Sequence, residues 1–202
     1  LNRNLSEAIF ANKVLLVEGP SEYTLFSKVL SVVQPFYEVG GIYILSVNGV
    51  GFENYLPILD KLKIFTVIKT DNDLRGIKGR KGYSAWGFSR CNQYIGEERL
   101  PIKQLPENSI SAKRDLYNSN KDTLDEIRNN YHIFLSKVDL ENDLDEFLHN
   151  KLSELLDSDN PVKYLQNKKH YHMVELIGKL SDEDCETIYN HYNFACLKEV
   201  AQ

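Results

Sequence analysis

The sequence predicts an α/β fold: a small parallel sheet of about four strands flanked by helices, with a mostly helical insertion and a helical C-terminal part. Residues 14–17 read Val-Leu-Leu-Val, a short apolar run typical of a strand buried on both faces. Similar runs recur at 42–47 and 64–69, and apolar residues at helical spacing lie between them. Strands that alternate with helices in this way favour parallel pairing.

The first strand is followed by acidic residues. It stops at Glu18, and Gly19-Pro20 then turns the chain. Ser21 is a candidate N-cap for a helix with an apolar side over 25–33. Glu22 lies in the first turn of that helix. Because sites in open α/β sheets collect at the carboxyl ends of strands, Glu18 and Glu22 predict a divalent cation there.

The third strand ends in a second acidic cluster. Residues 48–51 are expected to turn the chain into a helix over 55–62, and the strand over 64–69 then leads to Asp71 and Asp73. In this D-x-D pattern, an extended backbone directs both carboxylates to the same side. Two ligands can therefore face one metal ion.

The later part of the chain divides into two further segments. We expect the first part of the core at 1–96, a mostly helical insertion at 97–130, and the rest of the core with the C-terminal helices at 131–202. A fourth strand is predicted at 131–135. Ser181 and Asp184 have the spacing of a capping box for the last helix.

Asp139 and Glu141 follow the fourth strand and form a third acidic cluster. If the three strands lie side by side, all six carboxylates share one rim, and so much negative charge requires cations. Each acid also has an ordinary explanation as a helix cap or loop residue. Glu141 makes the weakest case, because acids are generally favoured in the first turn of a helix.

A basic, glycine-rich segment follows the D-x-D pattern directly. It either holds DNA phosphates beside the metals or is a solvated loop, and the sequence favours neither interpretation. Its basic residues are Arg75, Lys78, Arg80 and Lys81.

Four aromatic or imidazole side chains have two readings each. Tyr83 and Trp86 can stack on a base, but packing in the core is the simpler interpretation. His170 and His172 could form a metal pair. Their spacing does not align them on one helix face, which favours ordinary helix residues.

Composition limits the function classes. The net charge of −5 provides no bulk attraction to nucleic acid, so DNA binding needs a local basic patch, bound metal or another part of the protein. Three widely spaced cysteines without zinc spacing indicate reduced thiols and a cytoplasmic setting. No apolar run approaches the roughly 20 residues of a membrane span, so no membrane association is expected.

Three motifs carry a family resemblance: V-L-L-V-E-G-P-S-E, I-K-T-D-N-D-L-R and L-S-K-V-D-L-E-N-D-L. They resemble the C-terminal Toprim region of OLD-family nucleases, most closely the nuclease subunit of the Gabija anti-phage defence system. The run P-V-K-Y-L-Q-N-K-K-H-Y-H-M-V-E-L and the ending F-A-C-L-K-E are also similar, so the resemblance covers nearly the whole chain. It implies a metal-dependent DNA endonuclease that cleaves phosphodiester bonds with two Mg²⁺ ions, or Mn²⁺.

The resemblance also implies residue roles. Glu18 matches the catalytic glutamate, Asp139 a further essential acid, and Lys169 the catalytic lysine, with Lys168 as the adjacent register. The implied metal ligands are Glu18, Glu22, Asp71, Asp73, Asp139 and Glu141.

The family's architecture suggests partners beyond DNA. Members carry an N-terminal ABC-type ATPase, but this chain contains no G-x-x-x-x-G-K-[ST] motif. Together with a start at Leu1 rather than Met, this suggests a piece of a longer protein that lacks the ATPase region. The resemblance further implies a helicase-like partner subunit and a homo-oligomer.

Two other function classes remain open. An Asp-based phosphotransferase would use Asp71 as a covalent nucleophile, although such enzymes usually place D-x-D after the first strand. A non-catalytic assembly or docking module would keep the fold without the chemistry. Primase and topoisomerase roles are disfavoured, because zinc-ribbon cysteines and companion domains are absent from the sequence.

Overall fold

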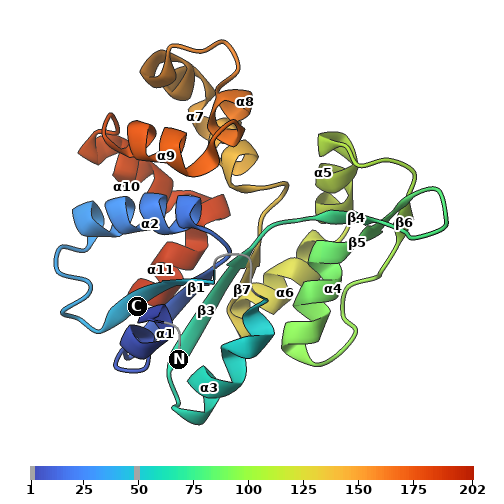
Figure 1. Cartoon of the computed structure of the whole chain (residues 1–202), viewed down its shortest axis with the longest axis horizontal. Helices are drawn as coiled ribbons and strands as arrows, with labels where there is room; N and C mark the ends of the chain where they lie inside the picture. The colour runs from blue at the N-terminus through green and yellow to red at the C-terminus, as the bar shows by residue number, and fades with distance from the viewer. Residues whose placement is uncertain (1–2, 48–50) are drawn as a thin grey trace.

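The computed structural model describes residues 3–47 and 51–202, and it leaves the side chains of residues 3, 4 and 169 undescribed. The predicted turn at 48–51 therefore lies, except for Gly51, outside the described residues. A four-stranded parallel sheet forms the centre, in the order β2-β1-β3-β7 (Figure 1). Its strands are β1 (Lys13–Val17), β2 (Ile42–Ser46), β3 (Phe65–Thr70) and β7 (Ile133–Leu135). The predicted α/β class and parallel pairing are confirmed.

The strand order brings the acidic clusters to one edge. β1 lies between β2 and β3, so Glu18 follows an inner strand, as predicted. β3 pairs with β1 at Leu16↔Ile68 and with β7 at Thr70↔Leu135. The three strands that precede acidic residues are therefore neighbours, and their carboxyl ends point the same way.

Each face of the sheet has its own layer of helices because side chains alternate along a strand. Leu15 and Val17 face one core, and Val14 and Leu16 face the other. The first core packs on α2 (Pro20–Val33), α7 (Leu140–Leu156), α8 (Pro161–Gln166), α9 (Lys169–Ile177), α10 (Asp182–Asn190), η2 (Tyr192–Phe194) and α11 (Ala195–Ala201). The second packs on α1 (Arg3–Ala8), η1 (Phe52–Asn54), α3 (Leu56–Lys61), α4 (Trp86–Ile95), α5 (Ile110–Asn118) and α6 (Lys121–Tyr131).

A small antiparallel sheet beside the main one was not predicted. It consists of β4 (Leu74–Gly76), β5 (Tyr83–Ala85) and β6 (Gln104–Leu105). One expectation is corrected here: Arg75 lies in strand β4 rather than in a loop. Tyr83 lies in β5. Backbone pairing from Leu74↔Ala85 to Gly76↔Tyr83 overrides the weak local signal of these glycine-rich residues.

Helix boundaries test two capping predictions. Ser21 is not the N-cap of α2: Gly19 takes that position, and Pro20 begins the helix, where its missing N–H costs no hydrogen bond. The capping box of Ser181 and Asp184 is confirmed at α10. The three cysteines are free and buried, as expected. Among the described residues, no helix combines the length and apolar character needed to cross a bilayer.

Candidate active site

Glu18 joins the ends of two adjacent strands. Its Oε1 accepts a hydrogen bond from Thr70 Oγ1 at 2.5 Å and another from the backbone N–H of Asp71 at 3.0 Å. The carboxylate after β1 is therefore fixed against the last residue of β3 and the first residue beyond it. This local geometry follows from the direct pairing of β1 with β3.

Asp71 is at the centre of the acidic cluster. Ser136 Oγ, just beyond β7, donates to Asp71 Oδ1 at 3.1 Å. The pKa of Asp71 is raised well above its usual range, first by burial and then by the charges of four carboxylates: Glu22, Glu18, Asp139 and Asp73. Four of the other five predicted acids therefore act electrostatically on Asp71.

Arg90, on α4, is a charged partner that the sequence interpretation missed. Its Nη1 lies 3.1 Å from Glu18 Oε1, and its Nη2 donates to Asp73 Oδ2 at 2.9 Å and to the Asp71 carbonyl at 2.6 Å. Burial lowers the pKa of Arg90, but the charges of Glu18 and Asp73 outweigh this effect and the pKa is raised. Arg90 therefore neutralises part of the cluster.

A close contact of backbones puts Arg90 in place. Gly87 donates its N–H to the Asp73 carbonyl at 2.9 Å, and a Cβ atom at Gly87 would lie only 2.8 Å from the Asp71 carbonyl oxygen. The first turn of α4 therefore rests directly on the D-x-D backbone, which only glycine permits. Arg90 lies three residues later, on the same side of the helix.

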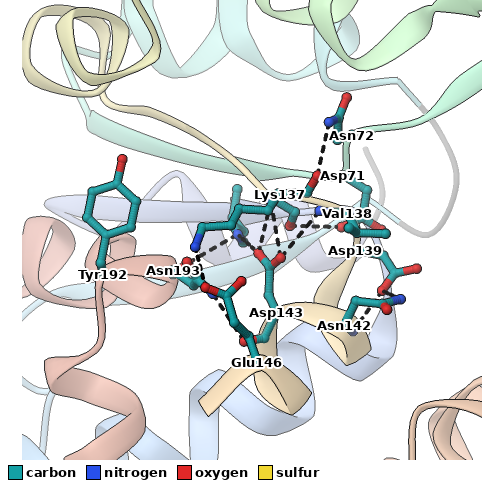
Figure 2. Close-up of polar contacts among 12 residues, drawn as sticks. Asp71, Asn72, Lys137, Val138, Asp139, Asn142, Asp143, Glu146, Tyr192 and Asn193 are labelled. Atoms are coloured by element: carbon teal, nitrogen blue, oxygen red, sulfur yellow. Dashed lines mark hydrogen bonds and ion pairs between the residues drawn. The ribbon is translucent and has the colours of Figure 1, made fainter. Parts of the chain in front are cut away.

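Asp139 has two roles at once. It is the N-cap of α7, where its Oδ1 accepts from the N–H of Asn142 at 2.9 Å and from Asn142 Nδ2 at 2.7 Å (Figure 2). Its Oδ2 accepts from Gln166 Nε2, on α8, at 3.1 Å. The ordinary capping role is real, yet the charge of Asp139 also reaches Asp71.

The remaining predicted residues differ in their placement. Glu22 is buried in the first turn of α2, and its charge acts on Asp71. Glu141 is buried in the first turn of α7, but its charge is not among those that raise the pKa of Asp71. Lys169 begins α9, and its side chain lies outside the described part of the molecule. Exposed Lys168 precedes it with a left-handed backbone.

The donor set is suited to a hard cation because it consists of carboxylate oxygens gathered where negative charge is costly. Within residues 3–47 and 51–202, no three Asp, Glu, His or Cys side chains converge closely enough to hold a metal ion as they stand. The contacts above explain this: Arg90 engages two of the carboxylates, and Asn142 and Gln166 engage Asp139. A cation would have to replace some of these donors.

A cavity of about 280 Å³ adjoins Glu18 and Arg90. Its aromatic lining comes from Phe52, Trp86 and Tyr94. Trp86 is 37% exposed, and the Arg75 guanidinium lies 4.8 Å from the centre of its ring. The simpler expectation that Trp86 is a core residue is therefore wrong.

The other basic residues and the two histidines have separate surroundings. Lys78, Arg80 and Lys81 are exposed in the connection between β4 and β5. His170 Nε2 lies 3.2 Å from Thr24 Oγ1, whereas His172 Nδ1 lies 2.6 Å from the Tyr164 carbonyl. The two imidazoles thus contact different protein partners.

Comparison with known families identifies the domain. Residues 9–73, which contain β1, β3 and the D-x-D pattern, match the model of the Overcoming lysogenization defect protein-like TOPRIM domain. The chain contains an OLD-like Toprim domain. It is also 41% identical over 212 aligned residues to Endonuclease GajA from Bacillus cereus (strain VD045). That alignment covers 99% of this chain and 36% of the relative, so the chain spans about a third of the relative's length.

Solved structures agree with the Toprim assignment at the level of the fold. The C-terminal region of the Burkholderia pseudomallei OLD protein superposes with a TM-score of 0.63 at 17% identity, covering 96% of this chain and 100% of that one. The C-terminal region of the Xanthomonas campestris pv. campestris OLD protein gives 0.59 at 17% identity, covering 96% and 94%. The similarity of fold therefore extends beyond residues 9–73 to nearly the whole chain.

Proposed function

We propose that this Toprim domain is the nuclease part of an anti-phage defence protein and cleaves DNA phosphodiester bonds with the help of divalent cations. The observation that carries the proposal is the half-buried Asp71 at the carboxyl edge of the sheet: it is tied to Glu18 and Ser136 by hydrogen bonds, and the charges of four further carboxylates act on it. Such a cluster is suited to Mg²⁺ or Mn²⁺. The similarity to Endonuclease GajA supports the choice of reaction.

The acids of the cluster would hold two cations, Mg²⁺ or Mn²⁺. Bound cations supply Lewis-acid stabilisation of the phosphate and lower the pKa of a bound water. The proposed ligands are Glu18, Glu22, Asp71, Asp73, Asp139 and Glu141, of which Glu141 has the least support from the structure.

Individual residues would accept a proton, balance charge and hold the DNA. Glu18 is held by Thr70 and the Asp71 amide, so its second carboxylate oxygen is available to accept a proton from water. Lys169 would offset the negative charge that develops on the phosphate. The basic side chains near β4 and β5 would hold the DNA backbone: Arg75, Lys78, Arg80 and Lys81.

The proposed partners lie beyond the part of the relative that this chain spans. Because the alignment covers 36% of Endonuclease GajA, we propose that an ABC-type ATPase region accompanies the Toprim domain in the whole protein. A helicase-like partner subunit and assembly into a homo-oligomer belong to the same proposal.

Cleavage of supercoiled plasmid tests the function. The chain should convert it to nicked or linear DNA with Mg²⁺ or Mn²⁺ but not with EDTA, and Glu18→Ala and Lys169→Ala should abolish this. Two matched controls should keep the activity: Asp60→Ala, an exposed acid on α3, and Lys168→Ala, the neighbouring lysine. Loss in Lys168→Ala but not Lys169→Ala would move the assigned lysine by one position.

Metal binding separates the proposal from its alternatives. If no DNA is cut but Mn²⁺ binds and the binding depends on Asp71 and Asp73, the site is real and the ATPase region is needed for activity. If no Mn²⁺ binds at millimolar concentration with DNA present, a docking module becomes the better assignment. A trapped aspartyl-phosphate at Asp71 would instead support a phosphotransferase.

A further inference from the structure

A buried ion pair lies behind the acidic cluster. Lys69 Nζ is 3.3 Å from Asp143 Oδ2, and the two side chains are 2% and 1% exposed. Lys69 comes two residues before Asp71 on β3, and Asp143 comes four residues after Asp139 on α7. Replacing such a pair by apolar residues is often neutral or stabilising, so stability alone does not account for its presence here.

Asp143 holds the segment that leads to Asp139. Its Oδ1 accepts from the backbone N–H of Lys137 at 3.1 Å and of Val138 at 3.3 Å, and its Oδ2 accepts from Lys137 N–H at 3.3 Å (Figure 2). One carboxylate thus fixes two consecutive amides directly before Asp139.

Asn72, the middle residue of D-x-D, binds the carbonyl groups of the same two residues. Its Nδ2 donates to the Lys137 carbonyl at 3.0 Å, and its N–H donates to the Val138 carbonyl at 3.2 Å. Residues 137 and 138 therefore lie between Asp143, which accepts from their N–H groups, and Asn72, which donates to their carbonyl groups.

The pair is also tied to the C-terminal part of the chain. Lys69 Nζ donates to the Asn193 carbonyl at 3.2 Å, and Asn193 Nδ2 donates to the Asp143 carbonyl at 3.2 Å. Asn193 is 1% exposed and belongs to η2. Strand β3, helix α7 and η2 are thus fixed to one another next to the acidic cluster.

We propose that Asp143 is a positioning residue that sets the distance of Asp139 from Asp71 by holding the amides of Lys137 and Val138. This inference rests on the proposed function, because it matters only if the two acids share cations. The Asp143 side chain is 1% exposed, so it acts through Asp139 rather than directly on DNA or a cation. Lys69 compensates its charge.

Two double variants separate this role from simple structural support. Lys69→Met with Asp143→Asn removes both charges but keeps an oxygen that can accept from both amides. Lys69→Met with Asp143→Leu removes the charges and the acceptor but keeps the branching of the side chain at Cγ. Both double variants eliminate the buried ion pair. They therefore differ in whether residue 143 can accept hydrogen bonds from the N–H groups of Lys137 and Val138.

Calorimetric titration with Mn²⁺ measures the difference. The Asn variant should bind Mn²⁺ within about 3-fold of the wild type, whereas the Leu variant should lose roughly 10- to 100-fold, as is typical when a group that orients a ligand is removed. In an Asp139→Asn background, the Leu variant should cause no further loss beyond about 3-fold, because Asp143 acts through Asp139.

The outcomes distinguish the inference from the function. Equal Mn²⁺ affinities of the Asn and Leu variants, or a full additional loss in the Asp139→Asn background, would overturn the positioning role. Absence of Mn²⁺ binding by the wild type at millimolar concentration, with DNA present, would instead refute the proposed function. If the Leu variant does not fold, as judged by thermal unfolding, Lys69→Met with Asp143→Ala removes the same acceptor and replaces it in the comparison.

Discussion

Replacing Arg90 by methionine should destabilise the domain when divalent cations are chelated. The Arg90 and Glu18 side chains are 15% and 27% exposed, so their contact counts as a partly buried ion pair of about 1–3 kcal/mol, between the values for exposed and buried pairs. The Asp73 side chain is 44% exposed, and solvent screening reduces that contact to below about 1 kcal/mol. The expected loss is about 2–3 kcal/mol, or roughly 5–10 °C in Tm for a domain of this size.

Cations should reverse part of this loss. Without its guanidinium, the cluster gains more from bound Mg²⁺, and a ligand at 100 times its Kd adds about 2.7 kcal/mol of stability. Thermal unfolding in EDTA and in Mg²⁺, for the wild type and Arg90→Met, measures both effects. Arg99→Met is the matched control, because Arg99 pairs with Glu97 and Glu126 away from the cluster. If Arg90→Met unfolds at the wild-type temperature in EDTA, or gains no more from Mg²⁺ than the wild type, Arg90 is not an internal counter-ion.

Three further outcomes are expected. Asp139→Asn should keep the cap of α7, because Asn is as good an N-cap as Asp, so the variant should unfold near the wild-type temperature. Its Mn²⁺ affinity in calorimetry should fall. An unchanged affinity would contradict the role of the Asp139 charge. Ser181→Ala should cost about 1 kcal/mol in urea unfolding through loss of the capping box, without changing Mn²⁺ affinity. Burial raises the pKa of Cys91 to about 12 and that of Cys196 to about 11, so both side chains stay neutral thiols at lower pH. Both should therefore resist alkylation at pH 8 until the protein is unfolded, and rapid labelling of the native protein would refute this.

The sequence was sufficient to predict the main sheet and the acidic edge. Buried parallel strands are apolar throughout, so the runs at 14–17, 42–47 and 64–69 stood out against their surroundings. The positions of Glu18 and Asp71 then followed from where those strands stop. The small sheet was missed because Leu74–Gly76 and Tyr83–Ala85 are too short and too rich in glycine and polar residues to give a periodic signal.

The charged residues around the cluster were missed for different reasons. Arg90 lies in an amphipathic helix, where an arginine ordinarily faces solvent, and only the Gly87 contact brings it to the acids. Asp143 looked like one of several acids in the first turns of α7. Lys69 did give a signal: a lysine in an apolar strand run requires a buried partner, although the sequence does not say which one.

The link from Lys69 to Asn193 joins residues 124 positions apart. Closing a contact this distant costs chain entropy, because the long stretch between the two residues loses freedom. On a ribosome, β1 and β3 emerge long before η2 does. A partly synthesised chain therefore lacks the last tie beneath the acidic edge, and the proposed nuclease reaches its working geometry only once nearly the whole domain has been made.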